Sequence, residues 1–380
     1  MTSLRVWAPR AAKLELVIGG ARISMQPDAG GWYGVSDPRL VAGTDYWLSV
    51  DGGPNTPDPR SREQPSGPHG PSRVVDPTSF SWTDAEFSPP ELGAGAVYEL
   101  HLGTFTPEGT CDGALARLGH LEKLGVSHVS LMPVADFPGR RGWGYDGVGL
   151  WAVHHAYGGP SGLMRFVDAC HARGIGVLLD VVYNHLGPDG NTLGRFGPYF
   201  TDQYRTPWGA AVNFDGPGSD EVRRFFCDNA CAWLTDYHLD GLRLDAVHAM
   251  HDESALHFLE ELKGRVLEVE RELGRRKVLV AESDLNDPRV LRDPILGGYG
   301  IDAQWSDDLH HALHSWLSGE RSGYYSDFGT AEQVAEALRH AFLYRGQKSE
   351  FRGRRHGREP TGLGANRFLA YSQTHDQIGN

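Results

Sequence analysis

Basic residues are few in this chain, because 36 Lys and Arg stand against 49 Asp and Glu and leave a formal net charge of −13 over 380 residues. Nucleic acid is therefore a disfavoured partner, since its phosphate backbone would be repelled. The sequence has no run of eighteen apolar residues, and its first residues lack the charged-then-apolar layout of a secretory leader. These absences predict a soluble, cytoplasmic protein that does not contact a membrane.

Cysteine is also scarce. The four cysteines form no CxxC pair and are too sparse for a disulfide scaffold: Cys111, Cys170, Cys227 and Cys231. The segment from Ser306 to His311 places Asp and His at a spacing that a metal could use, but a helix beginning at Ser306 explains the same residues. Neither a metal nor another cofactor is predicted.

Two regions differ in their pattern. Residues 1–90 alternate apolar and polar residues in short runs between Gly, Asp and Pro turns, for example at 4–7, 14–18 and 46–50. This pattern predicts an N-terminal antiparallel β-sandwich domain, which resembles carbohydrate-binding domains. An irregular connection with six prolines follows between Asp51 and Ser72, and Pro89-Pro90 marks the boundary.

Residues 91–380 alternate strand and helix, which predicts a parallel sheet and, over this length, a (β/α)₈ TIM barrel as the catalytic domain. The expected strands are 97–101, 128–132, 176–182, 241–244, 277–281, 301–305 and 367–371. The expected helices include 112–124, 162–173, 219–237 and 253–274. Only seven strands precede Asn380, so we expect a barrel that is truncated after its seventh strand and a chain that is a fragment of a longer protein.

The segment Asp240 to His248 carries the strongest chemical signal. Arg243 and Asp245 are two residues apart on an expected strand and therefore share one face of it. A carboxylate beside a guanidinium stays ionised at neutral pH, as a nucleophilic Asp requires. Three other expected strands also end in acidic, amide or imidazole groups, at 180–185, 280–283 and 374–377. In a TIM barrel such strand ends meet at one face, so these groups are expected to form one site.

Two carboxyl groups that face one bond are typical of glycoside hydrolysis, in which one attacks the anomeric carbon and the other protonates the leaving oxygen. Asp245 has Arg243 beside it and suits the first role. Glu282 follows an apolar run and has no basic neighbour in the next six residues, so a raised pKa and the role of general acid are expected. The alternative for each acid is an ordinary solvated or ion-paired surface residue.

The quartet 180–185, 241–245, 281–283 and 375–376 resembles the signature regions of the α-amylase family of glycoside hydrolases. Within that family, the segments 142–146, 304–311, 281–287 and 372–380 are most similar to a subgroup that acts on maltooligosyl trehalose. The resemblance runs from the N-terminal region to the last residue.

The resemblance implies a retaining double displacement. It assigns Asp245 as nucleophile, Glu282 as general acid and base, and Asp376 as the third acid, which holds sugar hydroxyls. Further residues are implied to bind the substrate or to brace the site: Arg243, His185, His375, Tyr145, Trp143, Asn184 and Asp180. Trp208 could line an outer subsite, although loop packing explains it equally well.

The expected reaction is therefore hydrolysis of the α-1,4 bond between a maltooligosaccharide and a terminal trehalose, which releases trehalose. The resemblance also implies a functional pairing with an enzyme that forms maltooligosyl trehalose. Two alternatives remain open at this point: a glycogen branching enzyme that uses the same three acids, and an inactive or merely glucan-binding fragment. Chain-length preference and oligomeric state are not encoded in any of these motifs.

Overall fold

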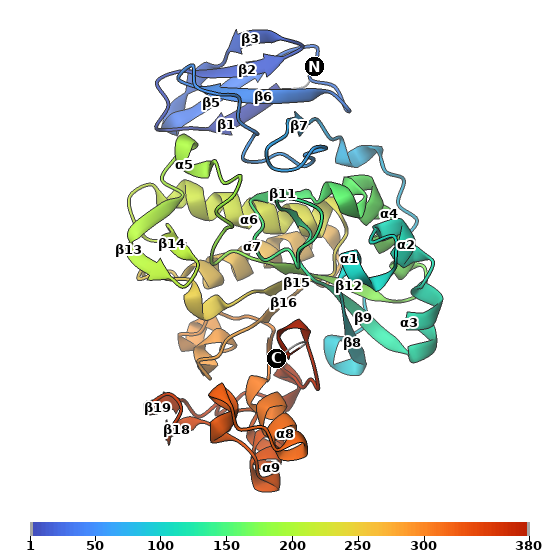
Figure 1. Ribbon diagram of the computed structural model, residues 1–380, viewed down its shortest axis with the longest axis vertical. Coiled ribbons are helices and arrows are strands. Elements are labelled where there is room, and N and C mark those ends of the chain that lie inside the picture. The colour runs from blue at the N-terminus through green and yellow to red at the C-terminus, as the bar shows by residue number, and fades with distance from the viewer. Residues whose placement is uncertain (1–2, 378–380) are drawn as a thin grey trace.

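The computed structural model describes residues 3–377. Its N-terminal part contains two antiparallel sheets, drawn in blue in Figure 1. One sheet has the order β1 (Ser3–Trp7), β5 (Trp32–Ser36), β4 (Gln26–Asp28), and the other has the order β3 (Ala21–Ser24), β2 (Leu14–Ile18), β6 (Asp45–Val50), β7 (Ser72–Arg73). The strands predicted at 4–7, 14–18 and 46–50 are confirmed as β1, β2 and β6.

The proline-rich connection after β6 fixes this region to the rest of the chain. Tyr46 donates a hydrogen bond from its hydroxyl to Asp58, 2.8 Å away. Arg60 then pairs with Asp228 of helix α6 (Ser219–Asp236) at 2.9 Å, and Arg62 pairs with another acid of the same helix. These contacts give a segment without regular structure a defined path.

A curled sheet of seven parallel strands forms the centre of the molecule (Figure 1). Its order is β20 (Phe368–Leu369), β17 (Ala303–Trp305), β16 (Val278–Ala281), β15 (Gly241–Leu244), β12 (Gly176–Val181), β9 (Val126–Leu131), β8 (Ala96–Leu100). Every residue of β12, β15 and β16 is buried, as expected for parallel strands that are covered on both faces. All seven predicted strands are confirmed, and the sheet fits a truncated TIM barrel with β8 and β20 at its edges.

Helices cover the outer face of this sheet. They include α2 (Cys111–Leu115), α3 (Leu118–Leu124), α4 (Gly159–His171), α6 and α7 (Phe258–Leu273). The helix predicted at 112–124 is two helices, α2 and α3, which are separated by Ala116 and Arg117. The helix predicted at 253–274 begins only at Phe258: His257 is its N-cap and accepts a hydrogen bond from the Leu259 amide, and Asp252 accepts one from the Phe258 amide.

Shorter elements lie at the strand ends. They are α1 (Leu102–Phe105), α5 (Leu193–Phe196) and the hairpins β10 (Ala135–Asp136) with β11 (Gly149–Val153) and β13 (Phe200–Thr206) with β14 (Gly209–Val212). No hairpin was predicted at these positions.

A separate lobe follows β17 and contains α8 (Asp307–Ser318), α9 (Ala331–His340) and the hairpin of β18 (Arg345–Ser349) and β19 (Arg354–Gly357) (Figure 1). The helix predicted to begin at Ser306 is confirmed as α8, although the Ser306 side chain makes no capping hydrogen bond to it.

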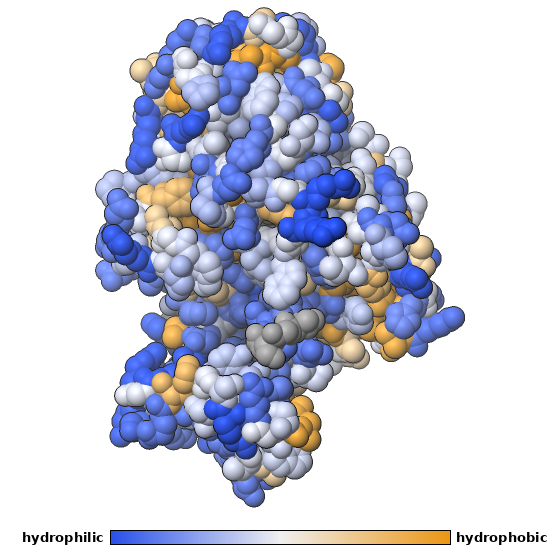
Figure 2. All heavy atoms as spheres, in the orientation of Figure 1, coloured by the Kyte–Doolittle hydropathy of each residue, from blue (hydrophilic) through white to orange (hydrophobic). Residues whose placement is uncertain are grey.

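The surface is mostly hydrophilic on the face shown in Figure 2, and its hydrophobic patches are small and scattered. Within residues 3–377, no helix combines the length and the apolar character that crossing a lipid bilayer requires.

Candidate active site

The guanidinium of Arg243 is the centre of the candidate site. Arg243 lies on β15 and is only 4% exposed. Its Nη1 donates to both oxygens of Asp180, at 3.0 and 2.8 Å, and to Oδ1 of Asp245 at 2.8 Å. Its Nη2 lies 2.9 Å from Oε2 of Glu282. One buried cation therefore binds the carboxylates at the ends of three adjacent strands, β12, β15 and β16.

Asp245 follows β15 directly and is held through both of its oxygens. Oδ1 accepts the Arg243 hydrogen bond, and Oδ2 accepts a hydrogen bond of 2.8 Å from the side-chain amide of Asn184. Both bonds fix the orientation of this carboxyl group. Ala246, the next residue, has a positive φ of 38°, a conformation that costs a non-glycine residue energy and is often found at functional sites.

Glu282 occupies a different environment. Its Oε2 accepts a hydrogen bond of 2.8 Å from the Ala246 amide and the ion pair from Arg243. Burial raises the pKa of Glu282 well above its ordinary value, and the charges of nearby acids add to this effect while Arg243 opposes it. The expected direction of the pKa shift is therefore found, although the six residues that follow Glu282 in the sequence did not reveal its basic neighbour in space. Arg243 is distant from Glu282 in sequence and adjacent to it in space.

Asp180 and Tyr145 form the back wall of the site. The Tyr145 hydroxyl donates to Oδ2 of Asp180 at 2.7 Å, and burial raises the pKa of Asp180 to about 6. Gly144 places the Tyr145 side chain: it has φ of +95°, and a Cβ there would lie 2.4 Å from the carbonyl oxygen of Pro133.

His185 lies beneath the tip of the β13–β14 hairpin. Its Nε2 lies 3.0 Å from the carbonyl oxygen of Tyr145, and its Nδ1 contacts the side-chain oxygen of Asn184. The ring of Trp208 stacks on His185 with centroids 4.5 Å apart, and Trp208 itself is 48% exposed. Burial lowers the pKa of His185, so a neutral imidazole is presented here at neutral pH.

His375 and Asp376 lie after β20, at the other end of the sheet. His375 stacks on Tyr145 with centroids 4.8 Å apart, and Trp143 lies edge-on to it at 5.6 Å. Its Nδ1 lies 2.9 Å from Oε1 of Glu99 on β8. This contact joins the segment after β20 to β8, the opposite edge of the sheet. Burial lowers the pKa of His375, but the hydrogen bond with Glu99 and the charge of Asp376 outweigh it, and the pKa is raised.

A cavity of about 390 Å³ opens beside these groups. Glu282 and Asp376 both line it, and Asp376 is half-exposed toward it, with Oδ1 3.3 Å from Nε2 of His375. Its other walls come from the lobe that follows β17 and from the end of β20: Asp284, Asp307, His311, Tyr324, Phe351, Arg352, Tyr371 and Gln377. Acids, aromatic rings and a guanidinium around an open cavity provide the polar and flat surfaces that bind sugars.

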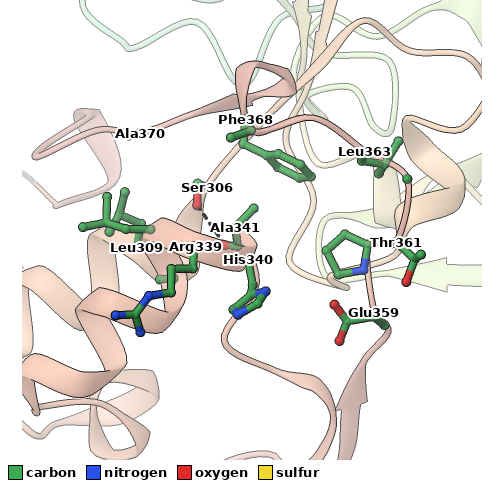
Figure 3. Close-up of a pocket in the computed structure, with 15 residues that line it drawn as sticks. Ser306, Leu309, Arg339, His340, Ala341, Glu359, Thr361, Leu363, Phe368 and Ala370 are labelled. Carbon is green, nitrogen blue, oxygen red and sulfur yellow. Dashed lines mark hydrogen bonds between the residues drawn. The ribbon is translucent and has the colours of Figure 1, made fainter.

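A second cavity, of about 380 Å³, contains none of the predicted site residues (Figure 3). It lies between α8, α9 and the segment 359–370, and Ser306 donates a hydrogen bond across it to the carbonyl oxygen of Ala341, 3.1 Å away. Leu309, Leu363 and Phe368 form apolar parts of its wall (Figure 3).

The structure thus brings the predicted residues into one continuous network. Ile378 to Asn380, the end of the last predicted segment, lie outside the described residues. Sequence reasoning missed Glu99, Asp307 and Tyr371. Glu99 and Tyr371 each lie at the end of a barrel strand, a position that could have marked them as candidates.

A parallel β/α sheet with paired acids at its strand ends is an arrangement found in glycoside hydrolases. The family described as alpha amylase, catalytic domain, matches residues 74–198. The chain belongs to the α-amylase family of glycoside hydrolases.

The names of its relatives are more specific than the family description. The chain is 51% identical over 384 residues to malto-oligosyltrehalose trehalohydrolase of Arthrobacter ramosus, covering 99% of this chain and 66% of that protein. It is 45% identical to the protein of that name from Saccharolobus solfataricus, and the match covers 100% of this chain and 66% of that protein. A crystal structure of a putative alpha amylase from Salmonella typhimurium has a TM-score of 0.92 at 40% identity, and the match covers 99% of this chain and 64% of that chain.

A 1,4-alpha-glucan branching enzyme of Corynebacterium jeikeium is more distant, at 30% identity over 80% of this chain and 48% of that protein. The chain spans about two thirds of the length of the trehalohydrolases that it matches.

Proposed function

We propose that this chain carries the catalytic machinery of a retaining glycoside hydrolase that cleaves the α-1,4 bond between a maltooligosaccharide and a terminal trehalose. The observation that carries the proposal is the position of Arg243 between Asp180, Asp245 and Glu282. This position supports the assignment of two acids with contrasting environments as general acid and nucleophile. The relatives named as trehalohydrolases support the choice of substrate.

In the first step, an oxygen of Asp245 attacks the anomeric carbon of the glucosyl unit as the bond to the leaving oxygen breaks. Glu282 gives its proton to that oxygen, and trehalose leaves as a neutral molecule. In the second step, water attacks the same carbon, its proton returns to Glu282, and Asp245 is released as a carboxylate. The raised pKa of Glu282 leaves it a proton to donate at neutral pH.

The remaining predicted residues have supporting roles in this proposal. Arg243 and Asn184 orient Asp245, and Asp180 with Tyr145 braces Arg243 from behind. The residues proposed to contact the sugar are His185, His375, Asp376, Tyr145 and Trp143. Neither a metal nor a cofactor is needed for any of these steps.

We also propose that residues 1–90 form a β-sandwich domain and that residues 91–380 form the catalytic domain. The two N-terminal sheets, each antiparallel, support this division. The substrate itself must be supplied by an enzyme that converts the reducing end of a maltooligosaccharide into trehalose, and this enzyme is the proposed functional partner.

The test is to incubate the protein with maltotriosyl trehalose and, separately, with amylose, and to separate the products by ion chromatography. Free trehalose together with maltotriose supports the proposal. New α-1,6 branches in amylose, without release of trehalose, would show a branching transferase instead. Binding of maltotriosyl trehalose without any product would show a glucan-binding chain. The Glu282→Gln variant controls for contaminating activity.

A further inference from the structure

Asp307 is a further acid at the candidate active site and has no part in the mechanism above. It is the first residue of α8, and its carboxyl group lines the same cavity as Glu282 and Asp376. Arg352 is the cation in that cavity wall, and it pairs with Asp284 at 3.0 Å. Among the residues that the structure describes, no ion pair includes Asp307.

The structure holds Asp307 firmly in this position. The hydroxyl of Tyr371, just beyond β20, donates to Oδ1 of Asp307 at 2.9 Å. Tyr371 is itself fixed between two rings: it stacks on His310 with centroids 5.0 Å apart and lies edge-on to Trp305 at 5.4 Å. Asp307 is therefore placed by β17 and β20 together.

The neighbouring residue of α8, Asp308, has a purely structural role. Its Oδ2 accepts hydrogen bonds from the amides of Leu343 and Tyr344, at 2.6 and 3.2 Å, and one of 2.7 Å from the side chain of Asn286. Asp308 thus connects α8 to the lobe. Asp307 makes one side-chain hydrogen bond and faces the cavity instead.

The charges around Glu282 come from several elements. Arg243 and Asp245 face it from β15, Asp307 from α8, and Asp376 from the segment after β20. Arg243 favours the ionised form of Glu282, and the three acids favour the protonated form. Of the other titratable groups in the cavity, the His311 imidazole stays neutral because burial lowers its pKa to about 3. Tyr371 stays neutral because burial and Asp307 raise its pKa well above 10.0.

We propose that Asp307 is a positioning residue for Glu282, whose carboxyl group it keeps protonated so that the proton is available to the leaving oxygen. Two acids in one poorly solvated cavity resist losing both of their protons, and their titrations become coupled. Asp307 is also poorly solvated: burial, with smaller contributions from Asp308, Asp284 and Asp376, raises its pKa to about 7. The proton delivered by Glu282 goes to the glycosidic oxygen, so this inference rests on the proposed function.

The test begins with Asp307→Asn, which keeps the shape of the side chain and removes its charge. Without the second acid, Glu282 loses its proton more easily, and the alkaline limb of kcat/KM moves to lower pH by about one unit. At a pH on that limb, activity falls about tenfold, whereas on the acid side it stays near that of the unmodified protein. Asp307→Glu should restore the profile. A role in folding alone would lower activity by the same factor at every pH.

A titration without substrate separates this inference from the proposed function. Protein labelled with ¹³C at glutamate carboxyl groups reports the ionisation of Glu282 by NMR, and Glu282→Gln assigns its signal. The midpoint for Glu282 should move to lower pH in Asp307→Asn and stay unchanged in Glu332→Gln, which alters an exposed acid of α9.

An unchanged Glu282 midpoint in folded Asp307→Asn would overturn the positioning role. A shifted midpoint in a protein that does not hydrolyse maltotriosyl trehalose would leave that role standing and refute the proposed function.

Discussion

Replacement of Arg243 by methionine tests the charge balance of the site. The substitution keeps most of the side-chain volume and removes the cation that lies within 3.0 Å of Asp180, Asp245 and Glu282. Removal of one partner from a buried ion pair typically costs about 3 to 5 kcal/mol, because the other charge is left without compensation. We expect a loss of this size in the free energy of unfolding, together with loss of activity.

The loss of unfolding free energy in Arg243→Met should depend on pH. The pKa values of Asp180 and Glu282 in the folded state already lie above their ordinary values, and without Arg243 they rise further. The folded state then binds more protons, so its stability falls as the pH rises through the folded-state pKa values. Urea unfolding should therefore show a larger deficit at about pH 8 than at about pH 5.

Arg165→Met removes an exposed pair with Asp112 and serves as the control, with little change expected at either pH. A deficit below about 1 kcal/mol at about pH 8 in Arg243→Met would refute the reasoning.

Three further predictions follow. Glu282→Gln should lower kcat by about two to four decades while the protein stays folded, as stopped assays and circular dichroism would show, and near-normal turnover would exclude an acid role. Glu99→Gln removes the partner that raises the pKa of His375. The substitution should therefore lower the free energy of unfolding more at about pH 6 than at about pH 9, where the imidazole is neutral. An equal loss at both pH values would contradict the ion pair. Trp208→Ala should raise KM more than it lowers kcat if this ring contacts the substrate outside the reacting unit, whereas Trp316→Ala, equally exposed at 48%, should change neither.

The sequence predicts the central sheet well because its strands are short apolar runs between clear turn signals. β12, with Gly176 at its start and every residue buried, is an example. Helix ends were predicted less well, since they depend on particular side chains. At the start of α7, Asp252 and His257 accept hydrogen bonds from the first amides of the helix, and no periodicity reveals such bonds.

The stretch 352–358 of the lobe, which contains four arginines, illustrates the same limit. Charge alone would favour a solvated loop for this stretch, yet Arg354 lies in a strand paired with Ser349, and Arg352 forms an ion pair with Asp284. The pairing depends on tertiary contacts.

Prediction of the site was strong for residues within motifs and weak for contacts between them. Asp245 and Arg243 are two residues apart, and their shared strand face implies their contact. The contact of Arg243 with Glu282 and that of Glu99 with His375 join distant segments, and only the curvature of the sheet brings them together. Reasoning from near neighbours in sequence therefore gave the correct pKa direction for Glu282 from an incomplete set of neighbours.

The most direct test of the account is to identify the residue that becomes covalently attached to the sugar. In Glu282→Ala, α-maltosyl fluoride should react without a general acid, because fluoride is a good leaving group, and the second step should be slow without a base. Peptide mass spectrometry after quenching should find one maltosyl group on the peptide that contains Asp245. Attachment to another residue, or release of fluoride to give β-maltose without any adduct, would contradict the account.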